Sequence, residues 1–126
     1  MTNKLKNKKK RWMMNLGKKG ELLAKGYLEK KGYTILEQNF RTRYGEIDII
    51  AKFQGEIIFF EVKTRSSSDH GLPCEAVNKL KQKKIRGVAN YYLLVTGCDG
   101  CKSRIDVIEI LIINQKPFIR QLSNVF

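Results

Sequence analysis

Acidic residues are scarce in this 126-residue chain: 12 aspartates and glutamates stand against 25 lysines and arginines, for a formal net charge of +13. Such an imbalance favours a polyanionic partner, most simply nucleic acid. An anionic membrane surface is the rival interpretation. It is the weaker one, because the basic segments lack a long apolar face.

Long apolar runs are also missing. No run approaches the ~20 residues needed to cross a bilayer. The basic N-terminus holds only three consecutive apolar residues, 12–14, so we expect no secretory leader. We therefore expect a cytoplasmic protein that does not enter a membrane.

Cysteine and histidine are few: three cysteines and one histidine, His70. An odd cysteine count without a leader is typical of a reducing compartment. Cys98 and Cys101 form a lone C-x-x-C, but structural zinc needs two further ligands, and Cys74 and His70 lack the spacing. We interpret the segment as an Asp-Gly turn and rank a reversible disulfide second. His70 receives no catalytic role.

The remaining pattern predicts one domain over residues 16–126 after a basic, disordered arm over residues 1–15. No repeat or second domain is visible. The predicted fold class is α/β, a mixed sheet flanked by helices. The predicted elements are a helix at 16–31 capped by Gly32, a strand at 33–40, a hairpin at 45–65, a loop at 66–73, a helix at 75–95, a strand at 104–113 and an edge strand at 117–121.

The hairpin is the centre of the chain. Two runs rich in isoleucine and phenylalanine flank Gln54-Gly55, and a two-residue turn there pairs Phe53 with Glu56. Counting back along the ladder places Asp48 opposite Glu61. Strict alternation assigns Glu46, Asp48 and Ile50 to one face of the first strand, and Ile47, Ile49 and Ala51 to the other.

Opposed carboxylates destabilise a hairpin, because directly paired residues have Cβ atoms only about 4.5–5.5 Å apart. Lys63, two residues beyond Glu61 on the same face, is one candidate for compensation. A divalent cation between Asp48 and Glu61 is the other, since Mg²⁺ binds one or two carboxylates together with substrate phosphate. Two acids and a lysine around such a metal form the outline of a phosphodiester-hydrolysing site.

An ordered series of motifs then carries a resemblance. The series is Gly20-Glu21, Gly32-Tyr33, Asn39-Phe40-Arg41, Gly45-Glu46-Ile47-Asp48, Phe60-Glu61-Val62-Lys63-Thr64-Arg65, Lys81-Gln82 and Arg104-Ile105-Asp106-Val107. It resembles the YraN-like family of small bacterial proteins, with a restriction-endonuclease-like PD-(D/E)xK nuclease fold and an αβββαβ core. Two departures are the missing proline before Asp48 and an isoleucine, Ile105, at an expected aromatic position.

The resemblance implies a metal-dependent DNA endonuclease. Asp48 and Glu61 would hold Mg²⁺ or Mn²⁺ together with the Val62 carbonyl, and Lys63 would orient the attacking water. Glu21 borders the apolar stripe of the first helix and would join the metal site; an ordinary first-turn glutamate is the alternative. Branched or otherwise non-duplex DNA is a candidate substrate.

Basic residues supply the predicted contacts to nucleic acid. They are Lys8, Lys9, Lys10 and Arg11 of the arm, Arg65 of the hairpin, and Lys81, Gln82, Lys83 and Lys84 of the second helix. A non-catalytic nucleic-acid-binding protein with the nuclease fold is the alternative function, and a structural adaptor with a buried ion network is the third. DNA is the expected partner, and a homodimer is left open.

Overall fold

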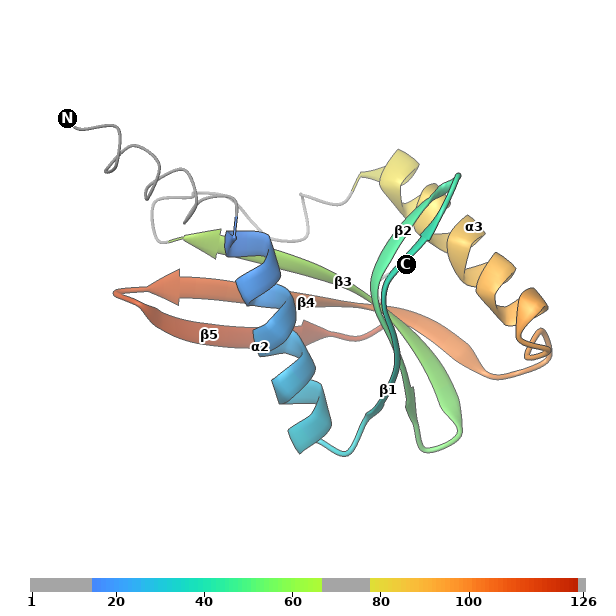
Figure 1. Ribbon diagram of the computed structural model, residues 1–126, viewed down its shortest axis with the longest axis horizontal. Helices are drawn as coiled ribbons and strands as arrows, with labels where there is room; N and C mark the ends of the chain where they lie inside the picture. The colour runs from blue at the N-terminus through green and yellow to red at the C-terminus, as the bar shows by residue number, and fades with distance from the viewer. Residues whose placement is uncertain (1–14, 67–77, 125–126) are drawn as a thin grey trace.

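A computed structural model describes residues 15–66 and 78–124 and shows a five-stranded mixed sheet with a helix packed on each face (Figure 1). The strands follow the order β1-β2-β3-β4-β5, and β3 and β4 are the parallel pair. The predicted α/β class is confirmed, and the order is consistent with a restriction-endonuclease-like αβββαβ core. The elements are α2 Leu16–Lys30, β1 Thr34–Thr42, β2 Gly45–Phe53, β3 Glu56–Ser66, α3 Lys79–Val95, β4 Ser103–Ile113 and β5 Lys116–Leu122.

Helix α2 covers the face of the sheet that carries Ile58 and Phe60, called here the α2 face. Ala24 and Leu28 lie on the buried stripe of the helix and pack into this cluster. Gly32 follows the helix with a φ of +95°, a left-handed conformation that glycine adopts without steric cost. The predicted C-terminal glycine is therefore confirmed.

Helix α3 covers the opposite face, called here the α3 face, and lies beside the β1–β2 hairpin (Figure 1). Val88 and Tyr92 pack there against Phe59 and Ile105. The Asn78 side chain accepts a hydrogen bond from the Lys81 N–H at 2.8 Å and caps the helix. Sequence analysis expected this helix to begin at residue 75, which was wrong, because Asn78 has an extended backbone and the helix begins at Lys79.

The central hairpin turns as predicted. Gln54 and Gly55 have φ values of +50° and +81°, both positive as in a type I′ turn. Phe53 pairs with Glu56, and the register continues regularly to Ile49 and Phe60. The turn residues alone therefore fixed which residues of the two strands face each other.

The predicted alternation of β2 is wrong at one position. Ile47 packs on the α3 face with Ile50, although regular alternation would place it with Ile49 on the α2 face. The register of β1 with β2 includes the pairs on either side but omits Asn39 and Asp48. Asn39 has a φ of +51°, so both strands depart from regular geometry at this point. Asp48 therefore lies at a break in the pleat.

The C-x-x-C segment is a turn, and its two cysteines are bonded. The Cys101 N–H donates to the Cys98 carbonyl at 2.9 Å, and the two side chains form a disulfide that packs beside α3. Ranking the disulfide second was wrong. The Cα atoms lie 5.0 Å apart, within the range that a disulfide bridges.

Several predictions fall outside the described residues. These are the arm over residues 1–14, with Lys8, Lys9, Lys10 and Arg11, most of the loop at 66–73, His70 and Cys74. Among the helices of the described residues, none is both long and apolar enough to cross a membrane.

Candidate functional site

Asp48 lies where the pairing of β2 with β3 ends. The register of β2 with β3 stops at Ile49 and Phe60, one position short of the predicted pair between Asp48 and Glu61. In place of a ladder partner, Asp48 accepts a hydrogen bond from the Val62 N–H on Oδ2 at 2.8 Å. Since the N–H and C=O of one strand residue point toward the same neighbouring strand, the Val62 carbonyl faces the same gap.

Glu61 is the buried carboxylate of the site, with 4% of its surface exposed. Its Oε1 atom lies 3.5 Å from Lys63 Nζ and 3.1 Å from Lys81 Nζ. Lys63 comes from the same strand, and Lys81 from the first turns of α3. Two ammonium groups therefore neutralise one carboxylate oxygen, and the second of them comes from a different element.

The pKa of Asp48 is raised from 3.8 to about 7. Burial is the largest cause, because a partly desolvated carboxylate loses hydration, and the charge of Glu61 is the second. Glu21 and Glu46 raise the pKa further, while the hydrogen bond from Val62 opposes the shift. Asp48 and Glu61 therefore lie close enough to repel each other, as the sequence predicted.

Glu21 reaches this site because α2 approaches β3 very closely one residue earlier. A Cβ atom built on Gly20 would lie 1.8 Å from Thr64 Oγ1, closer than any real contact. Only glycine allows the helix to lie so near the strand. Glu21 is near enough for its charge to raise the pKa of Asp48, and Lys63 contacts Glu61.

The oxygen donors available to a cation here are two carboxylates and a backbone carbonyl. Within residues 15–66 and 78–124, no three His, Cys, Asp or Glu side chains gather into a metal-binding group. A site built from Asp48, Glu61 and the Val62 carbonyl suits Mg²⁺ better than Zn²⁺, because Mg²⁺ uses few protein oxygens and keeps several waters. The repulsion between the two carboxylates is what such a cation would relieve.

The residues predicted to bind nucleic acid divide into four groups. Lys83 and Lys84 lie exposed on α3, with Gln82 between them and Lys81. Lys81 instead contacts Glu61, so its ammonium belongs to the carboxylate site. Arg65 lies on β3, two residues beyond Lys63, and the basic arm is outside the described residues.

Sequence analysis missed the roles of Asn39 and Lys81 at this site. Asn39 marks the break opposite Asp48, and the available signal was its residue type, since asparagine tolerates left-handed conformations better than most residues. Lys81 gave no local signal, because its contact with Glu61 depends on how α3 packs against the sheet.

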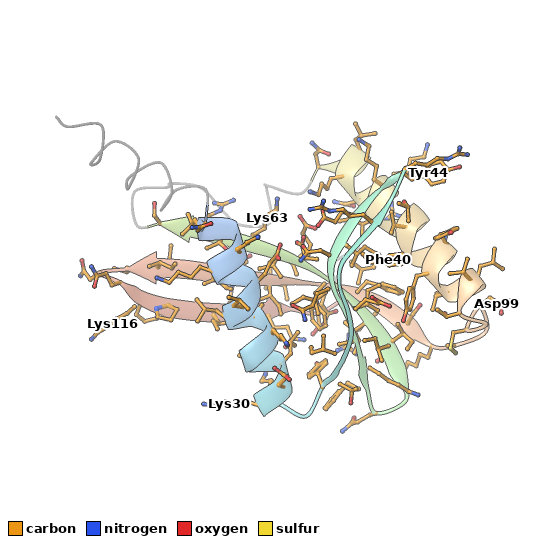
Figure 2. All side chains as sticks on the ribbon, viewed as in Figure 1. Lys30, Phe40, Tyr44, Lys63, Asp99 and Lys116 are labelled. Atoms are coloured by element: carbon orange, nitrogen blue, oxygen red, sulfur yellow. A yellow bond between two sulfur atoms is a disulfide. The ribbon has the colours of Figure 1, made fainter. Side chains whose placement is uncertain are left out.

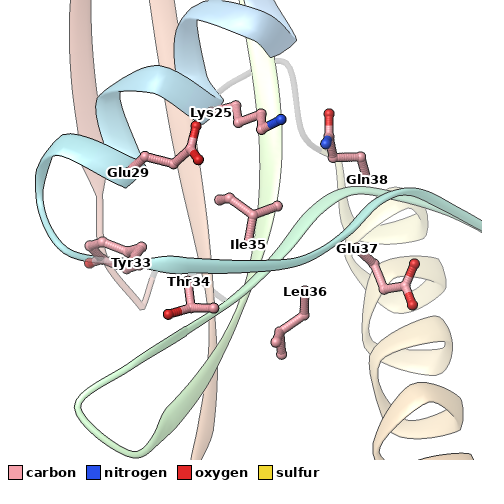
Figure 3. A pocket seen from close by; sticks show the side chains of 8 residues that line it. All are labelled: Lys25, Glu29, Tyr33, Thr34, Ile35, Leu36, Glu37 and Gln38. Carbon is pink, nitrogen blue, oxygen red and sulfur yellow. The ribbon is translucent and has the colours of Figure 1, made fainter.

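A depression on the described surface lies elsewhere. About 510 Å³ in volume, it is bounded by α2 and the edge strand β1, with Lys25 and Glu29 above Ile35 (Figure 3). None of the four predicted catalytic residues lines it.

Comparison with known proteins gives a consistent result. The model of the uncharacterised protein family UPF0102 matches residues 20–110. A UPF0102 protein of Alkaliphilus oremlandii is 51% identical over 113 residues, covering 88% of this chain and 97% of that protein. A UPF0102 protein of Clostridioides difficile is 48% identical over 107 residues, covering 85% and 92%. The matched residues include all four predicted catalytic positions.

Proposed function

The chain belongs to the uncharacterised protein family UPF0102, and we propose that it is a metal-dependent endonuclease that hydrolyses DNA phosphodiesters. The observation that supports this most strongly is the meeting of Asp48, Glu61 and Lys63 at a strand break, with the pKa of Asp48 raised to about 7. Burial and the neighbouring Glu61 both disfavour the charged form of Asp48, and a bound cation would offset both effects. Branched or otherwise non-duplex DNA is the proposed substrate.

The residues take separate roles in this proposal. Asp48 and Glu61 hold Mg²⁺ or Mn²⁺ together with the Val62 carbonyl. An ion held there would supply Lewis-acid chemistry for phosphodiester hydrolysis. Lys63 lies 3.5 Å from Glu61, so its ammonium reaches the phosphate side of the site and stabilises charge there. Glu21 holds a further water at the edge.

A non-catalytic nucleic-acid-binding protein is the second candidate, and one observation favours it. Lys63 and Lys81 both contact Glu61, so this carboxylate is already neutralised by protein groups. In a binder the cluster would be a structural ion network, as buried charges elsewhere often are. The two candidates differ in whether metal and Lys63 matter for cleavage.

Metal binding is the first test. Mg²⁺ or Mn²⁺ should raise the melting temperature, because a ligand that binds only the folded state stabilises it by RT ln(1 + [L]/Kd). Asp48→Asn should abolish the rise. Melting curves that coincide with and without saturating metal would count against the proposed ion.

Cleavage is the second test, on labelled duplex, flap, junction and single-stranded DNA with Mg²⁺, Mn²⁺ or EDTA. Lys63→Ala should lower the rate by ~10²–10³, the usual cost of losing one preorganised charge-stabilising group. Binding should change little, because one charge is lost from a large excess. Lys52→Ala is the matched control, an exposed lysine on the same hairpin. If wild-type protein binds several DNA forms and cuts none, the binder is the correct assignment.

A further inference from the structure

The turn between β1 and β2 presents an aromatic ring and a guanidinium to solvent. Tyr44 is 58% exposed, and the Arg43 guanidinium lies 5.0 Å from the centre of its ring. Arg43 Nη2 also donates a hydrogen bond to Tyr44 Oη at 2.8 Å. Figure 2 shows Tyr44 at the tip of this hairpin, beside α3. The two side chains, called here the hairpin tip, form one exposed cationic surface.

The hairpin tip is held in place by its own turn and by α3. Thr42 Oγ1 accepts from the Tyr44 N–H at 3.1 Å and donates to the Gly45 carbonyl at 3.4 Å. A Cβ atom on Gly45 would lie 3.4 Å from Val88 and 3.7 Å from Lys84, so the turn packs directly against the helix. A surface ordered before binding loses less entropy when a ligand arrives.

Positive charge surrounds the hairpin tip. The exposed cations of this end are Arg41, Lys79, Lys81, Lys83, Lys84 and Arg86. The nearby acids are Glu46, paired with Arg41 at 3.4 Å, and Glu61, paired with Lys81 at 3.1 Å. A second copy of the chain would bring the same net charge of +13 against this end. Charge complementarity therefore selects a polyanion as the occupant.

The distance from the hairpin tip to the carboxylates matches a short stretch of DNA. Tyr44 precedes Asp48 by four residues of β2, about 13 Å at 3.3–3.4 Å per residue. This length corresponds to about four base steps of 3.4 Å along one strand. A DNA backbone that crosses the start of α3 can therefore reach both the tip and the site.

We propose that the hairpin tip stacks on an exposed base at the boundary between duplex and single-stranded DNA. Inside a continuous duplex both faces of every base are covered by neighbouring bases, so only ends, flaps and junctions offer a face to Tyr44. Stacking on an aromatic side chain tolerates any base sequence, since every base has a π-face. The inference rests on the proposed function, because it specifies which DNA structure would bind at the carboxylate site.

The test measures binding in EDTA, where cleavage does not occur. Flap DNA carries 2-aminopurine at the base beside the junction, and covalently closed circular duplex is the competitor without ends. Tyr44→Ala should weaken flap binding by about 10- to 100-fold, the range found for loss of one base–aromatic stack. It should also remove the 2-aminopurine quenching and leave circular-duplex binding unchanged. Tyr44→Phe should keep both properties.

Phe118→Ala is the matched control. Phe118 is 57% exposed and lies on β5, the edge strand farthest from β1 in the sheet order, so its loss should change neither DNA form. Lys84→Ala should act differently from Tyr44→Ala, because loss of a phosphate contact reduces the log–log salt slope by about 0.7–0.9 for either DNA. Melting curves in the absence of DNA establish that each variant folds.

The outcomes separate this inference from the nuclease. If the wild type cleaves DNA and the Tyr44→Ala variant still prefers flap DNA, the inference is overturned and the proposed nuclease activity is supported. Flap binding that depends on Tyr44, without cleavage of any DNA, supports the inference and rejects the nuclease. Equal weakening on flap and circular DNA also overturns the inference, and absence of DNA binding by the wild type overturns both.

Discussion

Asp106 and Asp48 are two shielded aspartates of the same sheet, and they differ in the groups that surround their carboxylates. Asp106 on β4 is fully buried and accepts hydrogen bonds from Arg104 Nε at 3.0 and 3.3 Å, from Gln121 Nε2 at 2.9 Å and from the Asn124 N–H at 2.8 Å. Asp48 on β2 accepts a hydrogen bond from the Val62 N–H, and the charges of Glu61, Glu21 and Glu46 all raise its pKa.

The difference separates a carboxylate that stabilises the fold from one that weakens it. A buried charge is tolerated when a counter-charge and hydrogen bonds replace its lost hydration. Asp106 has both, and it ties β5 and the following Asn124 to the middle of the sheet. Among the described residues Asp48 has the hydrogen bond but no ion pair, so its charged form is disfavoured.

Breaking the Asp106 network should have the largest effect. Asp106→Asn leaves the half-buried Arg104 with Glu56 as its remaining carboxylate partner and weakens the hydrogen bonds from Gln121 and Asn124, so it should lower the free energy of unfolding by about 3 kcal/mol. Urea denaturation at pH 7 measures it. Asp99→Asn, an exposed aspartate in the turn before β4, should stay within about 0.5 kcal/mol. A loss no larger than that of the control would show that the network does not stabilise the fold.

Displacing α2 should have the next largest effect and should sharpen the comparison. Gly20→Ala places a methyl group against Thr64 and should cost about 2–3 kcal/mol, because the helix must shift or the core must deform. Gly26→Ala, where nothing lies within 4 Å, should gain up to about 1 kcal/mol from helix propensity. The shift also carries Glu21 away, so the pKa of Asp48, followed by carbon NMR, should fall in the Gly20 variant only.

The predictable parts of this molecule are those with local causes. The turn at Gln54-Gly55 set the hairpin register, and Gly32 set the end of α2. Arg104 and Asp106 pair across a spacing of two on one strand. Each of these follows from residues adjacent or nearly adjacent in the chain.

The unpredicted parts depend on contacts between distant elements. The pleat break at Asp48 involves Asn39 on another strand, and no pattern within β2 reveals it. Lys81 meets Glu61 only because α3 packs beside β3. Gln121 reaches Asp106 from a strand that pairs with β4 after the whole sheet has assembled. The hydrophobic periodicity of one helix or strand predicts which face a residue lies on. It does not predict which residue of another element that residue contacts.

Neutralising Asp48 should have the smallest effect on stability, and with the opposite sign to that at Asp106. A carboxyl group whose pKa rises on folding destabilises the folded state when it is ionised, so the cost is full above pH ~7 and fades as the pH falls toward ~4. Asn at this position has no charge and keeps an oxygen for the Val62 N–H. In EDTA, Asp48→Asn should therefore raise the free energy of unfolding by about 1–2 kcal/mol at pH 8, less than the full shift implies at about 1.4 kcal/mol per pKa unit. At pH 4 the two proteins should be nearly equal. Urea denaturation across pH 4–8 measures the difference, and a gain of the same size at every pH would show that repulsion by Glu61 and burial do not act on Asp48.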